Sequence, residues 1–279
     1  MRVPEHPAAP TVDDWWLDAP FVRVVGDLHG MHDSFLDAVR DARRRGGKVF
    51  CLGDFINRGP DSAGCMALAL RGAGEGWLDF VPGNHDHRLI LWRHAPEFLD
   101  AGDKGVLRST LEEIDALGDL GLVDSFCEMA LDAPVWRREG NTFFAHAMVC
   151  DASMTPPTLR QSAKIQGDIG AMAVWGPAIP TVTSLDVGWL DAMPEDSVTF
   201  LGHIPLSKET PGKITSRNGA VGVFMDTGCG LRRNAGPLSW VDVAPNDLLR
   251  PKAVAALFPE GDATEFNNFK AAQVAMAPR

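Results

Sequence analysis

Seven polar side chains recur along the chain, each close behind a short apolar run. They are Asp27, His29, Asp54, Asn84, His85, His146 and His203. Carboxylates, imidazoles and an amide oxygen, with no thiolate among them, suit borderline to hard divalent ions such as Mn, Fe, Zn or Co. Two such ions roughly 3.5–4 Å apart can bind the attacking and the departing oxygens of a displacement at phosphorus. A carboxylate that offers one oxygen to each ion is the natural shared ligand, so this set predicts a dinuclear metal centre.

The elements that must position these side chains follow one pattern in the first third of the chain. Apolar runs at 21–25, 48–52 and 77–81 each lead into a glycine-containing turn, and a helix-like stretch follows each turn. Asp61 or Ser62 is placed to cap the second helix. Strand–turn–helix units at this spacing predict βαβ crossovers and a largely parallel sheet. Chemistry in such sheets gathers at the carboxyl ends of the strands, where these polar turns lie.

The rest of the chain alternates between helical and strand-like patterns. The segment from about 88 to 138 reads as helical, and the segment 150–196 reads as loops and short helices that cap the site. Further strands are expected at 142–145, 198–201, 221–225 and 238–241. The segment 262–279 reads as a helix or a tail.

Composition limits the class of protein. The chain has 279 residues, 45% of them hydrophobic and 23% charged, and its formal net charge is −11. Such a chain is typical of soluble globular proteins, and its acidity disfavours general nucleic-acid binding. No apolar run approaches the roughly 20 residues that span a bilayer, and residues 1–20 lack the apolar core of a signal peptide. Five scattered cysteines without a C-x-x-C pair fit a reducing compartment, so we expect a cytoplasmic protein.

Six short motifs then stand in a fixed order along the chain. They are GDLHG at 26–30, GDFINRG at 53–59, GNHD at 83–86, AHA at 145–147, GHIP at 202–205 and DTGC at 226–229. Together they resemble the calcineurin-like metallophosphoesterases, within them the phosphoprotein-phosphatase branch, and most of all the bacterial diadenosine-tetraphosphatase-like members. The resemblance covers residues 21 to 243. It implies an α/β fold, a four-layer sandwich of two central mixed β-sheets flanked by helices, with an inserted helical cap.

The resemblance also implies a division of the chain and a role for each ligand. An N-terminal arm (1–20) would precede a metallophosphoesterase domain (21–245), whose cap segments are about 88–138 and 150–196, and a C-terminal extension (246–279) would follow. Two divalent ions are implied, manganese first, with Fe, Zn, Co or Ni as alternatives. Asp27 and His29 would bind the first ion, Asp54 would bridge both, and the second would be completed by Asn84, His146 and His203.

The same resemblance assigns the groups that act on the substrate. A hydroxide that bridges the two ions would attack phosphorus directly, so that no phosphoenzyme forms. Arg58 would hold two phosphoryl oxygens. His85 would protonate the departing oxygen, a contribution of roughly 10²–10⁴-fold for a well-placed acid.

Two residues depart from the protein phosphatases of this branch. Asn57 stands where they have an Asp that pairs with the catalytic His, and Asp86 stands where they have a Glu. Asn57 cannot supply charge, so His85 should be a weaker acid, and a weaker acid matters less when the leaving group is itself a phosphate. We therefore expect a small phosphorylated substrate of the nucleotide or polyphosphate type, for example a dinucleoside polyphosphate. A serine/threonine protein phosphatase and an RNA-end phosphatase stay open as alternatives with the same site.

Several further residues are weaker assignments. Arg160 is a weak substrate-binding candidate, chosen because it is the only arginine between His146 and His203. Lys164 is no better a candidate. Asp226 either orients a metal-bound histidine from outside the ligand set or acts directly in catalysis. Arg232 and Arg233 either contact the substrate or form a solvated basic pair.

Two rival functions remain to be weighed. The run VFMDTG at 223–228 resembles one half of an aspartic protease site, but such enzymes need two facing copies and the chain has one. A non-catalytic relative that uses the fold as a binding scaffold is a second rival, which the complete ligand set and His85 oppose.

Overall fold

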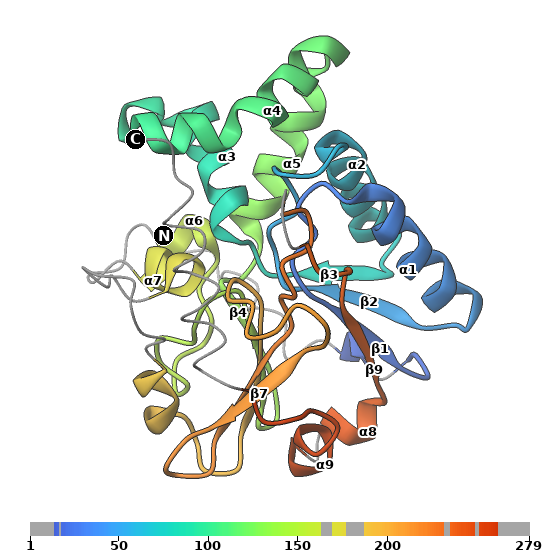
Figure 1. The fold of residues 1–279 in the computed structure, drawn as a ribbon, viewed down its shortest axis with the longest axis vertical. Coiled ribbons are helices and arrows are strands. Elements are labelled where there is room, and N and C mark those ends of the chain that lie inside the picture. Colours follow the sequence, from blue (N-terminus) through green and yellow to red (C-terminus); the bar gives the residue numbers. More distant parts are fainter. Residues whose placement is uncertain are drawn as a thin grey trace, which may run out of the picture.

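Two mixed β-sheets form the centre of the molecule, shown as a computed structural model in Figure 1. The structure describes residues 14–16, 18–162, 169–176, 187–231, 235–248 and 251–261. In the described residues one sheet has the order β3-β2-β1-β9 and the other β4-β5-β6-β8-β7. The first sheet contains β1 (Val22–Val25), β2 (Lys48–Cys51), β3 (Leu78–Phe80) and β9 (Trp240–Val243). The second contains β4 (Trp136–Glu139), β5 (Thr142–Ala145), β6 (Val198–Leu201), β7 (Gly212–Thr215) and β8 (Val221–Phe224).

Each sheet has a parallel centre. β1, β2 and β3 run parallel, and β9 pairs with β1 in the antiparallel direction. In the other sheet β5, β6 and β8 run parallel, with β4 and β7 antiparallel at the edges. The carboxyl ends of the parallel strands in one sheet therefore lie at one edge, where ligand sites form in such folds.

The core between the sheets is built from alternate strand residues, because successive side chains of a strand point to opposite faces. Val22 and Val24 of β1 belong to the same buried cluster as Phe144 of β5 and Phe200 of β6. Trp16 stacks on Phe144 with ring centroids 5.0 Å apart, and Phe144 stacks on Phe200 at 5.3 Å. The intervening strand residues pack with the helices in a second cluster. The result is the expected sequence of layers: helices, sheet, sheet, helices.

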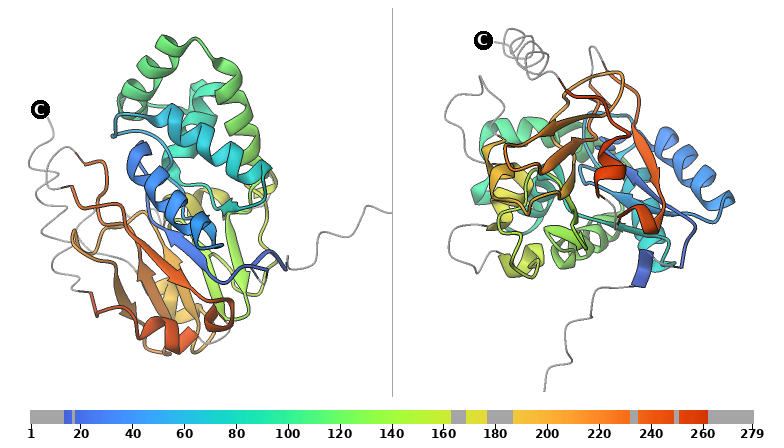
Figure 2. Two further views of the ribbon diagram at one scale, coloured as in Figure 1. Left: turned by 90° about the vertical axis from the view of Figure 1, so that its right-hand side faces the viewer. Right: turned by 90° about the horizontal axis from the view of Figure 1, so that it is seen from below.

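Helices cover the outer faces of the sheets and both ends of the molecule. They are α1 (His32–Arg44), α2 (Ser62–Gly74), α3 (Asn84–His94), α4 (Ala101–Leu117), α5 (Leu120–Asp132), α6 (Leu159–Ser162), α7 (Ile169–Trp175), α8 (Pro245–Leu248) and α9 (Pro251–Ala255). Short 3-10 turns lie at Asp14–Trp16, Pro96–Phe98 and Gly188–Ala192. Helices α3, α4 and α5 gather at one end of the molecule, and α8 and α9 lie at the other (Figures 1 and 2).

Local signals in the sequence explain where the helices near the site begin and end. The Asp61 carboxylate accepts a hydrogen bond of 2.6 Å from the backbone N–H of Gly64, so it caps α2 as predicted. Asp100 caps α4 in the same way through the N–H of Asp103. Gly118 ends α4 in a left-handed conformation (φ 67°), which glycine adopts without steric cost.

Two edge strands lie where the sequence predicts none. β4 falls inside the segment 88–138 that reads as helical, and β7 falls in a stretch with no expected strand. Both lie at sheet edges and contain few apolar residues, so their hydrophobic pattern is weak. β9 begins at Trp240 rather than at Leu238. On α4, Leu107 and Ile114 are buried, and Leu117 at the end of the helix is 58% exposed.

Candidate metal centre and active site

The loops after the parallel strands of both sheets meet at one place and carry the predicted ligands there. Asp27 and His29 follow β1, Asp54 follows β2, and Asn84 and His85 open α3 directly after β3. His146 follows β5 and His203 follows β6. All are buried except His203, which is partly exposed. The six predicted ligands, which come from five separate segments of the chain, thus lie together in one cluster with His85.

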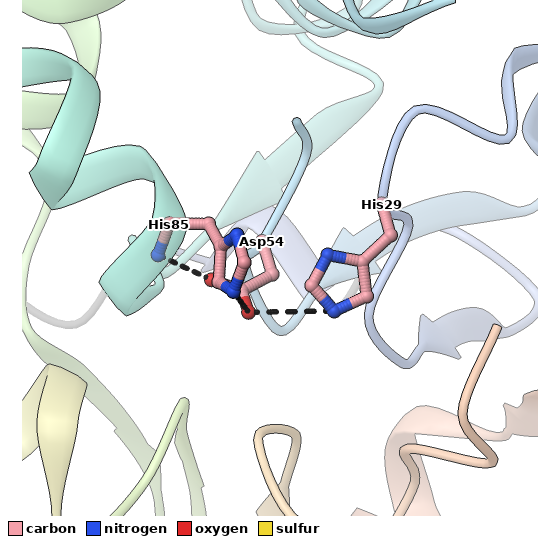
Figure 3. Close-up of side chains that lie close together, drawn as sticks. All are labelled: His29, Asp54 and His85. Atoms are coloured by element: carbon pink, nitrogen blue, oxygen red, sulfur yellow. Dashed lines mark hydrogen bonds and ion pairs between the residues drawn. The ribbon is translucent and has the colours of Figure 1, made fainter. Parts of the chain in front are cut away.

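Asp54 lies at the centre of this group and presents its two carboxylate oxygens in different directions. Its Oδ2 lies 3.6 Å from His29 Nε2 and 4.0 Å from His85 Nε2. Its Oδ1 lies 3.5 Å from His146 Nε2 and accepts a hydrogen bond of 2.8 Å from the backbone N–H of His85. Figure 3 shows Asp54 between the two imidazoles of His29 and His85. This placement fits the bridging role expected of Asp54.

Asn84 and Asp27 close the group on either side. The Oδ1 of Asn84 lies 3.0 Å from His146 Nε2 and 3.1 Å from His203 Nδ1. The Oδ2 of Asp27 lies 3.6 Å from His29 Nε2. Asp27 also accepts the backbone N–H of His203 at 3.0 Å, so it ties the loop after β6 to the end of β1.

Two histidines have their ring orientation fixed by backbone carbonyls. His29 Nδ1 donates to the carbonyl of Ile56 at 3.3 Å, and His146 Nδ1 donates to the carbonyl of Leu52 at 2.7 Å. Because a carbonyl can only accept, these contacts place the proton on Nδ1. The Nε2 lone pair of each ring therefore faces the centre, which is the arrangement typical of metal-binding histidines.

The donor set fits two ions that share Asp54. Ligand atoms of His29, Asp54 and His85 lie within 4.8 Å of one another, and so do those of Asp27, Asp54 and His146. Ligands about 2.0–2.2 Å from one ion lie roughly 3.0–3.6 Å apart. The separations of 3.5–3.6 Å between Asp54 and its two metal-facing histidines agree with that spacing.

The charge of the buried carboxylates favours cations at this position. Burial raises the pKa of Asp27 to about 7, with His146 opposing and Asp54 adding to the shift. Burial also raises the pKa of Asp226 to about 7, and Asp27 adds to it. Burial acts in the same direction on Asp54, but His146, His85 and His29 together lower its pKa below the usual value. Too little positive charge is therefore present in the protein itself to balance these acids.

Asp86 joins the loops that carry the ligands. Its carboxylate accepts three backbone N–H bonds of 2.9 Å each, from Asp54, Phe55 and Gly83. Burial raises the pKa of Asp86 to about 7, with Asp54 adding to the shift. A Cβ at Gly83 would collide with the Asp54 carboxylate, so only glycine permits this close approach. The GNHD motif therefore supplies a brace as well as a ligand.

Arg58 reaches into the centre from the loop after β2. Its Nη1 lies 2.6 Å from His29 Nε2 and its Nη2 lies 3.4 Å from His85 Nε2. This position suits the predicted grip on phosphoryl oxygens. Most of the non-glycine residues with positive φ in the described chain belong to this pocket: His29 (44°), Asp54 (52°), Asn57 (72°), Arg58 (69°) and His203 (66°). Strained backbone of this kind typically gathers at functional sites.

A chain of hydrogen bonds sets the direction of the Asn57 side chain. Thr110 of α4 lies 2.7 Å from Asn57 Oδ1, which can only accept, so the Thr110 hydroxyl donates. The amide nitrogen of Asn57 must then face His85 Nδ1, from which it lies 2.9 Å. An amide N–H can only donate, so His85 Nδ1 is the acceptor. The other ring nitrogen, Nε2, lies 4.0 Å from Asp54 Oδ2 and 3.4 Å from Arg58 Nη2.

A cavity of about 740 Å³ opens beside this cluster and extends toward the helices at the end of the molecule. Its lining includes cluster residues and side chains from α3, α4 and α7. They are Asp54, Arg58, Asn84, His85, Arg88, Gly105, Val106, Arg108, Ser109, Glu112, Trp175 and His203. A cavity of this size holds a small-molecule ligand.

The weaker sequence assignments have different surroundings. Arg160 pairs with Asp132 at 2.8 Å and Glu128 at 2.6 Å on the surface, and it does not line this cavity. Asp226 is buried and accepts the N–H of Gly228 at 2.7 Å. Lys164, Arg232 and Arg233 lie outside the described residues.

Sequence reasoning missed four residues of the site: Asp86 as a brace, Thr110, Arg88 and Arg108. The signal for Arg88 was its position four residues after Asn84, on the same face of α3. Arg108 and Thr110 lie on α4, and no local pattern indicates that this helix packs over the centre. Asp86 was noted only as a departure from the family pattern.

Comparisons with known proteins agree with the geometry. Residues 22–221 match the family model of the calcineurin-like phosphoesterases. Serine/threonine-protein phosphatase 1 of Salmonella typhimurium is 43% identical over 71 residues, which are 25% of this chain and 31% of that protein. The chain thus matches about a third of the length of this curated relative.

Two solved structures are among those to which the chain is similar. One is provisionally named a diadenosine tetraphosphatase (18% identity, TM-score 0.46, 81% of this chain and 94% of that chain). The other is a metallophosphoesterase from Sphaerobacter thermophilus (14% identity, TM-score 0.44, 86% and 95% of the two chains). Within the described part of the chain, no helix is long and apolar enough to cross a membrane.

Proposed function

The chain belongs to the calcineurin-like phosphoesterase family, and from this premise we propose that it hydrolyses phosphoanhydride bonds of nucleotides or polyphosphates in preference to phosphate monoesters. As a member of that family it is a metal-dependent phosphoesterase, a hydrolase. The finer proposal concerns the bond that is cleaved and the group that leaves.

The ligand set described above would hold two divalent ions, for which manganese is our first choice. When bound, such ions activate water and neutralise charge on the phosphoryl oxygens. In the net reaction, water adds to phosphorus and the bond from phosphorus to the bridging oxygen breaks. One product takes the hydroxyl of the water, and the remaining proton goes to the departing oxygen or to solvent. Arg58 would bind two phosphoryl oxygens, because its planar guanidinium offers paired donors.

The hydrogen bond between Asn57 and His85 carries the proposal. Asn57 donates to His85 Nδ1 and carries no charge that would stabilise a protonated ring, and burial holds the pKa of His85 well below its usual value, so the ring is neutral. Such a ring can donate a hydrogen bond to a departing oxygen, but it is a far weaker acid than an imidazolium. Thr110 holds the Asn57 side chain in place beside the ring through its contact of 2.7 Å with Oδ1.

The strength of the acid selects the leaving group. A departing alkoxide is about as basic as hydroxide, whose parent water has a pKa of 15.7, and it needs a proton as the bond breaks. A departing phosphate, with a second pKa near 6, leaves as a stable anion and gains less from protonation. A neutral hydrogen-bond donor in place of a full acid therefore favours anhydrides over serine or threonine esters.

A second candidate is a serine/threonine protein phosphatase. The sequence match to serine/threonine-protein phosphatase 1 of Salmonella typhimurium favours it, although that match covers 31% of the relative. In either case we propose a small or peptide-borne phosphate as the substrate rather than a nucleic-acid duplex, since the chain carries a net charge of −11.

A substrate panel tests the proposal. Diadenosine tetraphosphate, a phosphoserine peptide, RNA with a 3′-phosphate and a cyclic nucleotide are compared at matched concentration with Mn²⁺. We expect kcat/KM to be highest for diadenosine tetraphosphate, by about 10-fold or more. Highest turnover of the phosphopeptide would support the second candidate and overturn the first. The Asp54→Asn variant, purified in parallel, shows that the measured activity belongs to this protein.

A further inference from the structure

The cavity beside the cluster has a wall that is fixed to the catalytic loops. Helix α4 forms this wall with Gly105, Arg108, Ser109 and Glu112, which share one helical face. Another face of α4 is tied down by Glu113, whose carboxylate accepts the backbone N–H groups of Ser62 at 2.9 Å and Ala63 at 2.7 Å. Together with the contact from Thr110 to Asn57, these bonds hold α4 over the centre. The cavity is therefore a built part of the site.

Arg88 supplies a held positive charge at this cavity. It lies one helical turn after Asn84 on α3, about 6 Å along the helix axis from that ligand. Its Nε donates to Asp103 at 2.7 Å, and its guanidinium lies 4.1 Å from the centre of the Trp175 ring. Trp175 is held in turn, since its Nε1–H donates to His87 at 2.9 Å. The Nη1 of Arg88 is buried without a hydrogen-bond partner, and the part of the side chain that stays exposed, 14%, lies at the cavity.

Arg108 supplies a second positive charge from the opposite helix. It lines the cavity from α4, and no ion pair or hydrogen bond joins it to any described residue. Beyond the cluster, Glu112 is the single carboxylate in the lining. Arg88 is paired with Asp103, so the positive charges left at the cavity are Arg58 at its inner end and Arg108, against one acid, Glu112, outside the cluster. This balance selects an anionic occupant.

We propose that this cavity binds the leaving portion of a phosphoanhydride substrate, with Arg88 and Arg108 donating hydrogen bonds to the phosphoryl group next to the one that is attacked. The inference rests on the proposed function, and it names the part of the substrate that the helical cap recognises. The phosphoryl group under attack lies at the cluster with Arg58. The rest of the substrate, a nucleotide or a polyphosphate chain, extends along α4. The enzyme accordingly binds a diphosphate unit more tightly than a single phosphate.

Equilibrium binding tests the proposal without turnover. The probes are AMP and the non-hydrolysable α,β-methylene analogue of ADP, titrated into the Mn²⁺-loaded protein by calorimetry. We expect the wild type to bind the diphosphate analogue about 10-fold or more tightly than AMP, since hydrogen bonds to charged groups are among the strong ones. Equal affinity for the two probes in the wild type would overturn the proposal.

Matched variants locate the effect. Arg108→Ala should reduce the preference for the diphosphate analogue by about 10-fold and leave AMP binding within twofold, because Arg108 is exposed and its side chain forms no hydrogen bond or ion pair with the described residues. Arg108→Lys should retain part of the preference. Arg40→Ala, which removes an exposed arginine of α1, is the control and should change neither affinity. An unchanged preference in Arg108→Ala, with melting temperature equal to wild type, would overturn the assignment of Arg108.

The two proposals fail in different ways. If the phosphopeptide is the best substrate but the diphosphate preference is present and depends on Arg108, the cavity proposal stands and the proposed function falls. If anhydrides are the best substrates but Arg108→Ala binds and cleaves them like wild type, the proposed function stands and the cavity proposal falls.

Discussion

Two buried clusters of charge in this molecule are built on opposite principles. Arg23 of β1 is only 1% exposed, and its guanidinium contacts Asp242 at 2.6 Å and Asp41 at 2.8 Å. Its remaining donor binds the carbonyl of Ala38 at 2.8 Å. At the other end of β1, the acids Asp27 and Asp54 are buried with histidines and backbone N–H groups, and Arg58 is the cation nearest to them.

The contrast separates structural charge from functional charge. The Arg23 cluster satisfies itself, because every charge there has an opposite partner within hydrogen-bond distance. The metal centre does not, and burial raises the pKa of Asp27, Asp86 and Asp226 to about 7. A buried charge that lacks a partner is costly unless something else supplies the partner. We infer that cations complete the second cluster and that nothing needs to complete the first.

The largest expected effect is the loss of activity in Asp54→Asn. The substitution removes the carboxylate that both ions would share, and one lost charge-stabilising group already costs about 10²–10³-fold. We expect kcat to fall by at least about 1000-fold, and the melting temperature of the chelated protein to fall as well, because the neighbouring histidines lower the pKa of Asp54 and so favour its charged form in the folded state. Steady-state kinetics and thermal melts measure both. A near-native rate in metal-loaded Asp54→Asn would contradict the bridging role.

Removal of metal should destabilise the protein, and the loss should depend on pH. Saturation at 100 times Kd stabilises a fold by about 2.7 kcal/mol, which chelation would remove. The raised pKa values of Asp27, Asp86 and Asp226 mean that the folded chelated protein holds protons that the unfolded chain has released. Its stability is therefore full below about pH 4 and declines as pH rises toward about 7. Urea unfolding at several pH values checks this.

The Arg23 cluster should show the reverse pH sign. Arg23, through its hydrogen bond, lowers the pKa of Asp41. The contribution of that pair is therefore present above the unfolded pKa near 3.8 and is lost as pH falls further. In the metal-loaded protein we expect no decline of stability as pH rises toward 7. If the metal-loaded protein declined in the same way as the chelated protein, the contrast between the two clusters would be wrong.

A smaller effect is expected from Asp242→Asn in the self-satisfied cluster. Arg23 then keeps Asp41 but loses its paired bonds to Asp242, and hydrogen bonds between charged groups contribute about 1.5–3 kcal/mol. We expect unfolding free energy to fall by about 2 kcal/mol with kcat/KM unchanged. Asp37→Asn, an exposed acid on α1, is the matched control. A loss of activity without loss of stability would reverse the roles of the two clusters.

The smallest effect is expected from Asn57→Asp. The new carboxylate would accept a hydrogen bond from a protonated Nδ1 of His85. The ring could then carry a proton on each nitrogen and act as a stronger acid. We expect about 10-fold faster turnover of a phosphoserine peptide, a fraction of the roughly 10²–10⁴-fold that general acids supply. The rate on diadenosine tetraphosphate should change little. An unchanged or lower peptide rate in the folded variant would count against the leaving-group argument.

The part of the site that follows strands could be predicted from the sequence. Asp27, Asp54 and His146 each come just after a buried apolar run, and in a parallel sheet such positions converge whatever the intervening chain does. The capping of α2 by Asp61 could be predicted for a similar reason, because a cap and its N–H partner are only three residues apart in sequence. Local chemistry therefore predicted that these side chains lie together, and it predicted much of the order of the elements.

The wall of the cavity could not be predicted in the same way. Arg108 lies over the centre because Thr110 and Glu113 bind residues about 50 positions earlier in the chain, and no periodicity reveals such contacts. The edge strands β4 and β7 could not be predicted, because each contains few apolar residues and pairs with only one neighbouring strand. Arg160 looked plausible by its place between two motifs, but its pairing with Asp132 depends on tertiary structure.

The left-handed backbone of the pocket limits how the enzyme could be made more robust. His29, Asp54, Arg58 and His203 keep positive φ angles, which cost a residue with a side chain about 1–2 kcal/mol. Glycine would relax each of these positions, so selection for heat resistance alone would replace the groups that we propose bind the metal ions and the phosphate. Mutant libraries that aim at higher thermal stability should therefore keep these four residues unchanged and vary the outer helices.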